Sequence, residues 1–488
     1  MSALPTTHRP FVIAAVMASM FMVAIEATIV STAMPQIVGQ LGGLSLYSWV
    51  FSSFLLTQTA ATVVFGKLSD VYGRKPVMLV GIGVFLAASL LCGFARSMPA
   101  MIAFRLLQGI GAGAIQPIAL TIVGDLYSAE ERGRIQGFLA SVWAVSAVMG
   151  PLAGGFIIEH ASWSWIFWLN LPVGLLAAGG FVLFLHEGVL RERRRIDAAG
   201  AALFTVTIGA LMVALTEAGN SDERGALIAA GVAVVGAVLF VLQERHAPEP
   251  VIAFSVWSRR PIAASNGSSL LAGMALIGLT TFLPMYVQGV LGRTPLVAGL
   301  ALTVMVLGWP IGATLAARTL KRFGLRPILL TGSLLLPAGA SLLLTLGPGS
   351  APFTAGFASL VMGFGMGLLS TAALVLIQEI VPWSQRGSAT ASNVFSRNLG
   401  STLGATVFGA VLNHGLRNGG AGVNADELQR LLATGTAAPG LDGIRTALQQ
   451  ALHLTFWAMF VIAAAGVVLA WLVPHVPLGR SRETTPAE

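Results

Sequence analysis

A carboxylate and a guanidinium, each set in a long apolar run, are the residues whose types could do chemistry in this sequence. Glu26 stands in "MVAIEATIVSTAMPQI" and Arg105 in "FRLLQGIGAGA". Placing an unpaired, ionised carboxylate in hydrocarbon costs much free energy, so Glu26 must be protonated, paired with a cation or beside a water-filled cavity. A carboxylate in that setting can bind and release a proton, and a proton and a substrate can then displace each other.

The elements that must position these residues are long apolar helices. The chain has 488 residues, of which 55% are hydrophobic and 10% charged, against roughly 25% charged in a soluble protein. Apolar runs of about 20 residues recur along it, and each can cross a hydrocarbon core of ~30 Å as a helix. The composition therefore predicts an all-α polytopic membrane protein.

The charges and the single cysteine exclude other classes. The net charge of +8 comes from basic residues in short segments beside apolar runs, which indicates membrane topology rather than nucleic-acid binding. Cys92 alone can build neither a disulfide framework nor a cysteine metal cluster. HExxH, GxSxG and phosphate-loop motifs are absent from the sequence, so we expect no enzyme activity, no cofactor and no metal site.

Fourteen membrane spans are expected, and an even number puts both termini on one side. Most basic residues between the spans fall on that side, which is the cytoplasmic side by the positive-inside rule. We therefore expect an integral protein of the plasma membrane, which is the inner membrane in a bacterium. The spans are predicted near 11–33, 47–66, 77–95, 100–124, 135–158, 165–186, 199–216, 226–243, 262–288, 297–317, 327–347, 353–378, 389–413 and 454–474.

The depths of Glu26 and Arg105 in the membrane predict that they pair. Glu26 lies about 15 residues into the first span, hence ~8 Å from the external edge. Arg105 lies about 5–6 residues into the fourth span, which runs the opposite way, hence ~8–9 Å from the same edge. The alternative is that this carboxylate only ties the two spans together structurally.

The chain also repeats itself. "GKLSDVYGRKP" at 66–76 is echoed 251 positions later by "ARTLKRFGLRP", and "DLYSAEERG", which starts at 125, is echoed 254 positions later by "EIVPWSQRG". Such offsets indicate two duplicated six-helix halves, as in transporters with parallel repeats. The predicted divisions are 1–190 for the first half, 191–260 for two extra helices with basic flanks, and 261–488 for the second half, which includes an external loop at 414–453.

The first repeated loop resembles the signature of the major facilitator superfamily, G-x-L-x-D-x-x-G-R-K/R. The resemblance implies a latch that holds the two halves together in the outward-open state, with the alternative that these charges only anchor the loop. Glu379, the repeat mate of Asp125, is expected to pair with Arg322 or Arg386. The predicted latch residues are Asp70, Arg74, Lys75, Asp125, Arg132, Glu379 and Arg386.

Two further motifs resemble signatures of the same superfamily. "RLLQGIGAGA" is similar to R-x-x-x-G-x-G-x-G, in which the arginine is implicated in proton coupling, so Arg105 is expected to act with Glu26. Gly150, Pro151, Gly154 and Gly155 resemble the antiporter signature G-P-x-x-G-G, which exporters carry. A proline there should kink the helix and free backbone groups for other partners.

The resemblance narrows to one branch of the superfamily. "EATIVSTAMPQI" and "WSWIFWLNLPVG" are similar to the fourteen-spanner drug:proton antiporter family, in which the usual aspartate is Glu26 here and the usual asparagine is Ser31. The resemblance implies a proton-coupled exporter of amphiphilic or cationic drugs and toxic compounds. The alternative is a proton-coupled exporter of one metabolite, siderophore or lipid. The expected partners are a small-molecule substrate, protons and membrane lipid, with no nucleic acid, and the expected state is a monomer.

Several polar and aromatic residues are candidates for the substrate cavity. Arg397 lies close to mid-membrane in its span by the helical rise. Three roles are open for it: it contacts an anionic group of the substrate, it contacts Glu26 in one state, or it binds an interface carboxylate and ties the halves together. The aromatic candidates lie in spans that face the cavity in the family, and an aromatic lining suits bulky lipophilic compounds, although core packing would also explain them. The candidates are Gln108, Trp143, Phe282, Tyr286, Trp309 and Arg397.

Overall fold

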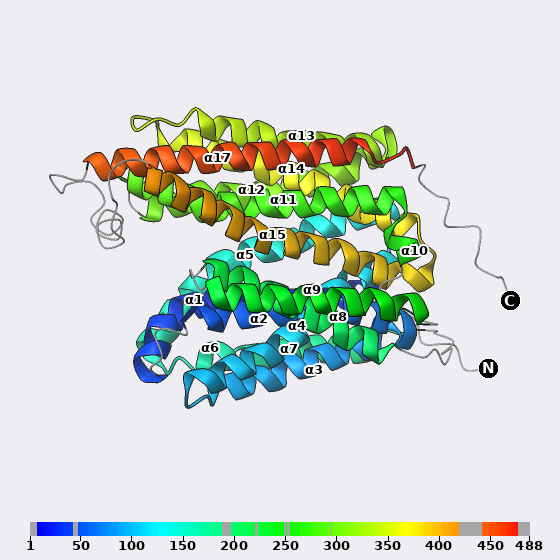
Figure 1. The fold of residues 1–488 in the computed structure, drawn as a ribbon. Coiled ribbons are helices and arrows are strands. Elements are labelled where there is room, and N and C mark those ends of the chain that lie inside the picture. The colour runs from blue at the N-terminus through cyan, green and yellow to red at the C-terminus, as the bar shows by residue number, and fades with distance from the viewer. Residues whose placement is uncertain are drawn as a thin grey trace, which may run out of the picture.

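The computed structural model describes residues 7–41, 47–187, 197–219, 223–247, 250, 254–293, 295–418 and 442–476, and these parts are almost entirely helical (Figure 1). In chain order the elements are α1 (Arg9–Leu41), α2 (Tyr47–Tyr72), α3 (Arg74–Gly93), α4 (Met98–Leu126), α5 (Ala129–His160), α6 (Trp165–Trp168), α7 (Asn170–Phe184), α8 (Ala198–Gly219), α9 (Glu223–His246), α10 (Phe254–Trp257), α11 (Arg260–Met285), the π-helix η2 (Tyr286–Val290), α12 (Pro295–Phe323), α13 (Leu325–Leu344), α14 (Pro352–Glu379), the 3-10 helix η3 (Trp383–Gln385), α15 (Arg386–Asn418) and α17 (Asp442–Trp471).

The helices are of membrane-spanning length and composition. Within the described residues, eleven stretches are long and apolar enough to cross a membrane, and they fall on α1–α4, α6 with α7, α9, α11 with η2, α12–α14 and α17. The other predicted spans, 135–158, 199–216 and 389–413, fall on α5, α8 and α15. The prediction of an all-α membrane fold is confirmed, while the number fourteen stays a prediction.

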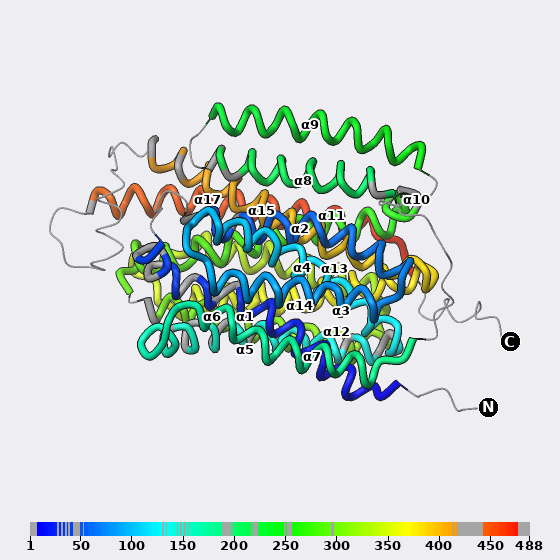
Figure 2. Tube along the Cα trace, turned by 90° about the horizontal axis from the view of Figure 1, so that it is seen from below, coloured from blue at the N-terminus to red at the C-terminus, as the bar shows by residue number. Residues whose placement is uncertain are grey.

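The helices form two bundles that meet along the middle of the molecule. In Figure 1, α1–α7 form the lower bundle and α11–α17 the upper one. The bundles pack on each other through α5 against α12 on one side and through α2 against α15 on the other. The two helices α8 and α9 lie outside this second seam, where α8 contacts both α2 and α15 (Figure 2). The division points at 190 and 260 stay predictions.

The sequence repeat is visible in the backbone. Gly73 and Gly324, which the repeat aligns, both adopt positive φ angles, of 92° and 78°. This region of φ is open to glycine and strained for other residues. Each glycine ends one long helix and starts the next, so the same tight turn joins α2 to α3 and α12 to α13.

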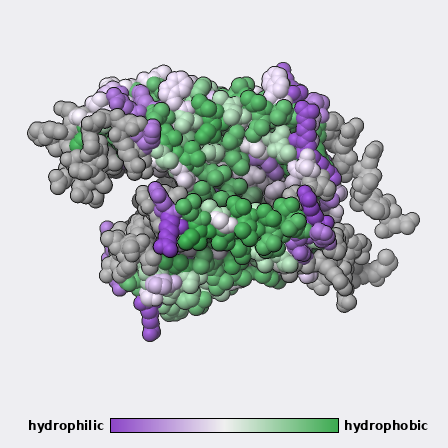
Figure 3. All heavy atoms as spheres, viewed as in Figure 1, coloured by the Kyte–Doolittle hydropathy of each residue, from purple (hydrophilic) through white to green (hydrophobic). Residues whose placement is uncertain are grey.

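The surface shows how the molecule would lie in a bilayer. Apolar side chains cover the middle of the visible face, and hydrophilic side chains gather towards the two ends (Figure 3). α1 begins and α17 ends at the same end of the molecule, which we call the terminal end (Figures 1 and 2). The opposite end is called the distal end.

The segment around the expected external loop differs from the prediction. α15 runs to Asn418 and α17 begins at Asp442, so "IRTALQQALH" at 444–453 forms the first turns of α17 and is not part of an external loop. The reason is its helical spacing, because Ile444, Leu448 and Leu452 are buried on one face. "ADELQRLLATG" at 425–435 lies outside the described residues.

Candidate functional site

The two charged residues singled out from the sequence form a buried ion pair. Arg105 Nη1 on α4 donates to Glu26 Oε1 on α1 over 2.6 Å. Glu26 is fully buried and Arg105 is nearly so. The pairing follows the depths predicted from the helical rise, since α1 and α4 run in opposite directions and bring the two residues to the same level.

A layer of polar side chains surrounds the pair. The second carboxylate oxygen of Glu26 accepts a hydrogen bond of 2.7 Å from Asn170 Nδ2 on α7. On the other side, Gln108 Oε1 accepts from Arg105 Nη1 over 2.7 Å, and Gln108 Nε2 donates to Ser89 Oγ on α3 over 2.8 Å. Four helices therefore hold the pair, and a buried charge pair is tolerated only when its remaining hydrogen-bonding groups are satisfied in this way.

Arg105 is also fixed by the neighbouring helix α2. Its Nε donates to the carbonyl of Val50 over 3.1 Å, and its guanidinium lies 4.3 Å from the centre of the Phe54 ring. Sequence reasoning missed Asn170 and Ser89, although Asn170 could have been noticed as the lone amide in the apolar stretch "WIFWLNLPVG".

A large cavity lies between the two bundles. Its volume is about 1150 Å³, and its lining comes from both bundles and from α8. Along α15 the lining runs from Asn393, two turns after the helix begins at the terminal end, to His414 near the distal end. The cavity therefore stops short of the terminal end and extends towards the distal end.

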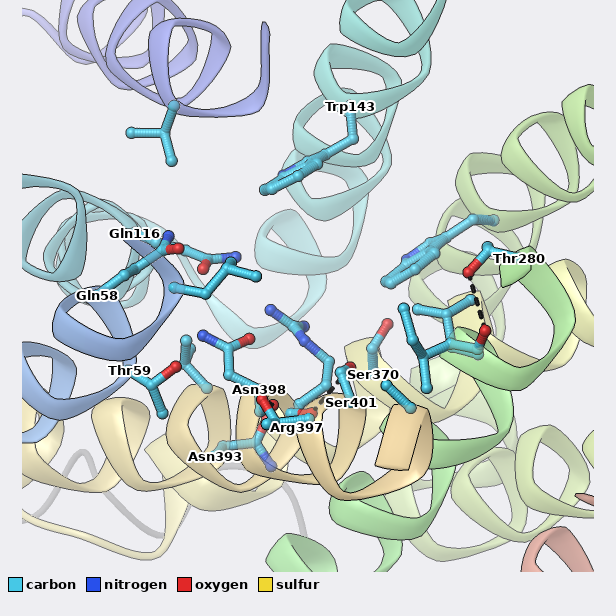
Figure 4. A pocket seen from close by; sticks show the side chains of 18 of the residues that line it. Gln58, Thr59, Gln116, Trp143, Thr280, Ser370, Asn393, Arg397, Asn398 and Ser401 are labelled. Atoms are coloured by element: carbon cyan, nitrogen blue, oxygen red, sulfur yellow. Dashed lines mark hydrogen bonds between the residues drawn. The ribbon is translucent and has the colours of Figure 1, made fainter. Parts of the chain in front are cut away.

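Three of the six predicted cavity residues line this space. Trp143 on α5, Trp309 on α12 and Arg397 on α15 all contribute to the lining. Figure 4 shows Arg397 rising from α15 towards Trp143 on the opposite bundle. Arg105 also lines the cavity, whereas Glu26 lies behind it, outside the lining. Of the two paired residues, only Arg105 therefore contributes to the cavity wall.

The other three predicted cavity residues lie elsewhere. Gln108 is fully buried in the polar layer behind Arg105. Phe282 packs edge-on against Phe408, with ring centres 6.3 Å apart, and the Tyr286 hydroxyl donates to the carbonyl of Leu346 over 2.8 Å. On α11 it is Leu276, Ile277 and Thr280 that face the cavity, and Phe282 lies about 200° round the helix from Thr280. For these two aromatic residues the structure shows the alternative, core packing.

The terminal end is closed by an ion-pair cluster around Arg74. Its Nε donates to Asp125 Oδ2 and its Nη2 pairs with Asp70 Oδ1, both over 3.0 Å. Its guanidinium also lies 4.2 Å from the centre of the Trp383 ring, and its Nη2 donates to the Trp383 carbonyl over 2.9 Å. Trp383 belongs to the second bundle, so this arginine of the first bundle links the two.

Asp70 makes a second link by capping a helix of the other bundle. Its carboxylate accepts from the backbone N–H groups of Gly387 and Ser388, over 2.9 and 2.7 Å, and from the Ser388 hydroxyl over 2.7 Å. These residues form the N-terminus of α15, where free N–H groups and the helix dipole favour a negative charge. The first turn of α15 is thus held by α2.

Two further ion pairs each join a carboxylate of one bundle to an arginine of the other. Asp125 pairs with Arg386 over 3.3 Å, and Glu379 pairs with Arg132 over 2.9 Å. Each carboxylate ends a helix of one bundle and binds the arginine of the other. The pair that the structure shows for Glu379 is thus with Arg132, and its expected pairing with Arg322 or Arg386 stays a prediction. Which arginine it binds depends on the docking of the bundles, which sequence spacing does not encode.

The start of α5 positions Arg132. Ser128 and Glu131 form a capping box, in which the Ser128 hydroxyl accepts from the Glu131 N–H and the Glu131 carboxylate accepts from the Ser128 N–H. The hydrogen bond from the Ser128 N–H to the Glu131 carboxylate holds the pKa of Glu131 below its ordinary value. Arg132, next along the helix, then points across to Glu379.

Lys75 does not take part in the contact between the bundles. Its Nζ donates to the carbonyls of Val182 and Leu185, each over 2.8 Å, at the end of α7 in its own bundle. The nearby backbone N–H groups of Arg74 and Lys75 donate to Glu187, over 2.7 and 3.0 Å. Glu187 was missed from the sequence because it lies in the segment after the predicted sixth span.

The predicted antiporter kink lies on α5. The helix is continuous through Gly150, Pro151, Gly154 and Gly155, and it packs against α1 and α12. The packing around Pro151 and Gly155 lies outside the described part of the structure. The kink therefore stays a prediction.

Two helical bundles around a cavity that is closed at one end are the architecture of a membrane transporter. The chain belongs to the Major Facilitator Superfamily, whose family profile matches residues 16–405. Members of this family are transporters of small molecules.

The relatives and the solved structures agree with this assignment. The chain is 34% identical over 414 residues to the multidrug transporter protein MdtP of Bacillus subtilis, covering 83% of this chain and 76% of that protein. It is 33% identical over 496 residues to multidrug resistance protein 3 of the same organism, covering 98% and 96%. The solved structure of the human organic anion transporter MFSD10 shares the fold, with a TM-score of 0.65 at 17% identity over 96% of this chain and all of that one.

Proposed function

We propose that this protein is a proton-coupled antiporter that exports amphiphilic drugs and toxic compounds across the plasma membrane by alternating access. It works as a monomer with fourteen spans and both termini in the cytoplasm. The observation that carries the proposal is the buried Glu26–Arg105 pair, because one of its members, Arg105, forms part of the cavity wall. The similarity to one protein named for multidrug transport and another named for multidrug resistance supports drugs as the cargo.

The coupling step is a proton exchange at Glu26. When Glu26 binds a proton it loses its negative charge, and Arg105 loses its counter-ion. The guanidinium is then free to turn towards the cavity and interact with water or cargo. When the proton leaves, the pair forms again, and the polar layer of Asn170 and Gln108 guides the carboxylate and the guanidinium back into place. Protonation and cargo binding are thus linked through Arg105 rather than by direct competition at Glu26.

The state described by the structure is the outward-facing one under this proposal. The ion pairs at the terminal end hold the cytoplasmic side closed, and the cavity extends towards the external, distal side. To open inward, the protein must break the Asp125–Arg386 and Arg132–Glu379 pairs and release α15 from Asp70. These residues form the latch of the transport cycle.

The size of the cavity favours a broad range of cargo over a single metabolite. Its volume of about 1150 Å³ lies above the range of roughly 300–1,000 Å³ that is usual for dedicated ligand pockets. A tightly fitted site for one metabolite, siderophore or lipid would be smaller and more enclosed. The alternative of a single cargo is therefore the weaker one.

The test is Glu26→Gln in purified protein reconstituted into liposomes. We expect the variant to insert and fold, because the amide oxygen can still accept from Arg105. It should lose dye transport driven by an imposed pH gradient, with at least a tenfold lower rate than the wild type. Glu159→Gln is the matched control, because Glu159 is an exposed glutamate on α5. Undiminished pH-driven transport by Glu26→Gln would refute the coupling role.

A further inference from the structure

The cavity is positively charged, although it was expected to take cations. Its lining in the described residues contains no aspartate and no glutamate, while the basic lining residues are Arg105, Arg397 and His414. Arg105 is neutralised by Glu26, which leaves Arg397 as the guanidinium whose charge no neighbour among the described residues balances. A cationic compound would meet this charge in the middle of the cavity.

The backbone around Arg397 is closely packed, whereas its guanidinium has no partner among the described residues. α15 and α11 approach closely because Gly273 has no side chain, and the carbonyl of Arg397 lies against it. Within the described residues the guanidinium makes no hydrogen bond and no ion pair. Apart from the helical hydrogen bonds, the carbonyl of Arg397 accepts from the Ser401 hydroxyl over 3.2 Å. An arginine at membrane depth normally pairs with a neighbour, so this one is available to a ligand.

The surroundings of Arg397 fit the anionic end of an amphiphile. Asn398, next on α15, also lines the cavity, and its side-chain amide is not engaged by the described residues. Figure 4 shows Arg397 and Asn398 together on the cavity side of α15, facing Trp143. A guanidinium beside an amide suits a carboxylate, sulfonate or phosphate group, and Trp143 and Trp309 offer flat apolar surfaces for the rest of the molecule.

We propose that the cargo is an amphiphile with an anionic group, which Arg397 binds directly in the cavity, and that cationic amphiphiles are disfavoured. This inference rests on the proposed export function and narrows its substrate class. It also gives the two arginines separate tasks, since Arg105 responds to the proton and Arg397 recognises the cargo. A charge-assisted contact of this kind changes affinity by roughly tenfold to a hundredfold.

The experiment compares two probes that share one apolar body and adds a cationic probe of a different body. 1-Anilinonaphthalene-8-sulfonate carries a sulfonate, N-phenyl-1-naphthylamine is its uncharged parent, and ethidium is the cationic probe. Equilibrium binding to the purified full-length protein is measured by fluorescence without any proton gradient. The wild type should bind the sulfonate at least tenfold more tightly than the parent, and Arg397→Gln should remove this preference while leaving the affinity for the parent within about twofold.

The controls separate the role of Arg397 from general damage. Arg318→Gln removes an exposed arginine of α12 and should leave the preference intact. Arg397→Lys keeps the charge, so it should retain part of the preference even if Arg397→Gln folds poorly. The proposal is overturned if ethidium binds the wild type as tightly as the sulfonate, or if Arg397→Lys and Arg397→Gln both keep the wild-type preference.

Binding and transport distinguish the two proposals. If the sulfonate binds through Arg397 but no probe is transported with a pH gradient, the export function fails and the anion site stands. If the wild type transports the probes but binds the anionic, uncharged and cationic ones with equal affinity, the anion site fails and the export function stands.

Discussion

Two arginines line the same cavity from opposite bundles, and their surroundings differ. Arg105 on α4 is bound to Glu26, Gln108 and the carbonyl of Val50. Arg397 on α15 has no such partner among the described residues. In the first bundle an internal carboxylate therefore neutralises the cavity arginine. In the second bundle no described residue neutralises the arginine, and its charge faces the cavity.

This difference shows how a duplicated fold can divide two tasks. A paired arginine responds to whatever changes the charge of its partner, which is the property that proton coupling needs. An unpaired arginine responds to whatever enters the cavity, which is the property that cargo recognition needs. The two bundles share loop motifs and backbone turns at Gly73 and Gly324, yet their central charges differ.

The largest expected effect is on stability, and it tests whether the two arginines really differ in pairing. Glu26→Leu should lower the free energy of unfolding by about 3 kcal/mol, because Arg105 stays buried without its counter-ion. Arg397→Leu should not lower it, since that guanidinium has no ion pair in the part of the chain that the structure describes. The measurement is denaturant or thermal unfolding of the purified proteins in detergent.

A double variant provides the control for this prediction. Glu26→Leu combined with Arg105→Leu should regain most of the lost stability, because replacing a whole buried pair by apolar residues is often neutral. Equal losses for Glu26→Leu and Arg397→Leu would contradict the contrast between a paired and an unpaired arginine.

The next effect is on the opening of the terminal end, which the ion pairs between the two bundles hold closed. Arg132→Gln breaks the pair with Glu379 and should favour opening of the terminal end by about 2 kcal/mol, or roughly thirtyfold. A cysteine introduced at Gln136, which lines the cavity, should react correspondingly faster with a thiol reagent in inside-out vesicles. Cys92, the only native cysteine, is buried and gives a low background.

The charge-swapped double variant is the control for the latch. Arg132→Glu with Glu379→Arg should restore slow labelling, because the pair forms again with its charges reversed. Labelling that stays slow in Arg132→Gln alone would show that this pair does not hold the bundles together.

The sequence predicted what depends on fixed helical geometry. The rise per residue placed Glu26 and Arg105 at one depth, and the structure brings them within 2.6 Å. The loop repeats predicted the residues that gather at the terminal end, except that Lys75 binds within its own bundle. Helix rise and short loop motifs are local properties, so a single sequence contains them.

The contacts that the sequence did not predict depend on how helices rotate and dock. Phe282 and Tyr286 were chosen for their aromatic type, but α11 turns Thr280 and not these residues towards the cavity. The pairing of Glu379 with Arg132 and the capping of α15 by Asp70 arise only when the two bundles meet. These orientations follow from packing over the whole interface, which spacing along the chain does not specify.

The smallest expected effect tests whether the contrast can be removed by giving Arg397 a partner of its own. Ser401 lines the cavity on α15, four residues after Arg397 and on the same helix face. In Ser401→Asp the added carboxylate should pair with Arg397 and cancel its charge. The affinity for 1-anilinonaphthalene-8-sulfonate should then fall about tenfold, while the affinity for ethidium rises. Ser401→Asn, similar in size but uncharged, should change neither by more than about twofold. If both variants weakened sulfonate binding equally, the cause would be steric, and the charge of Arg397 would not be what separates it from Arg105.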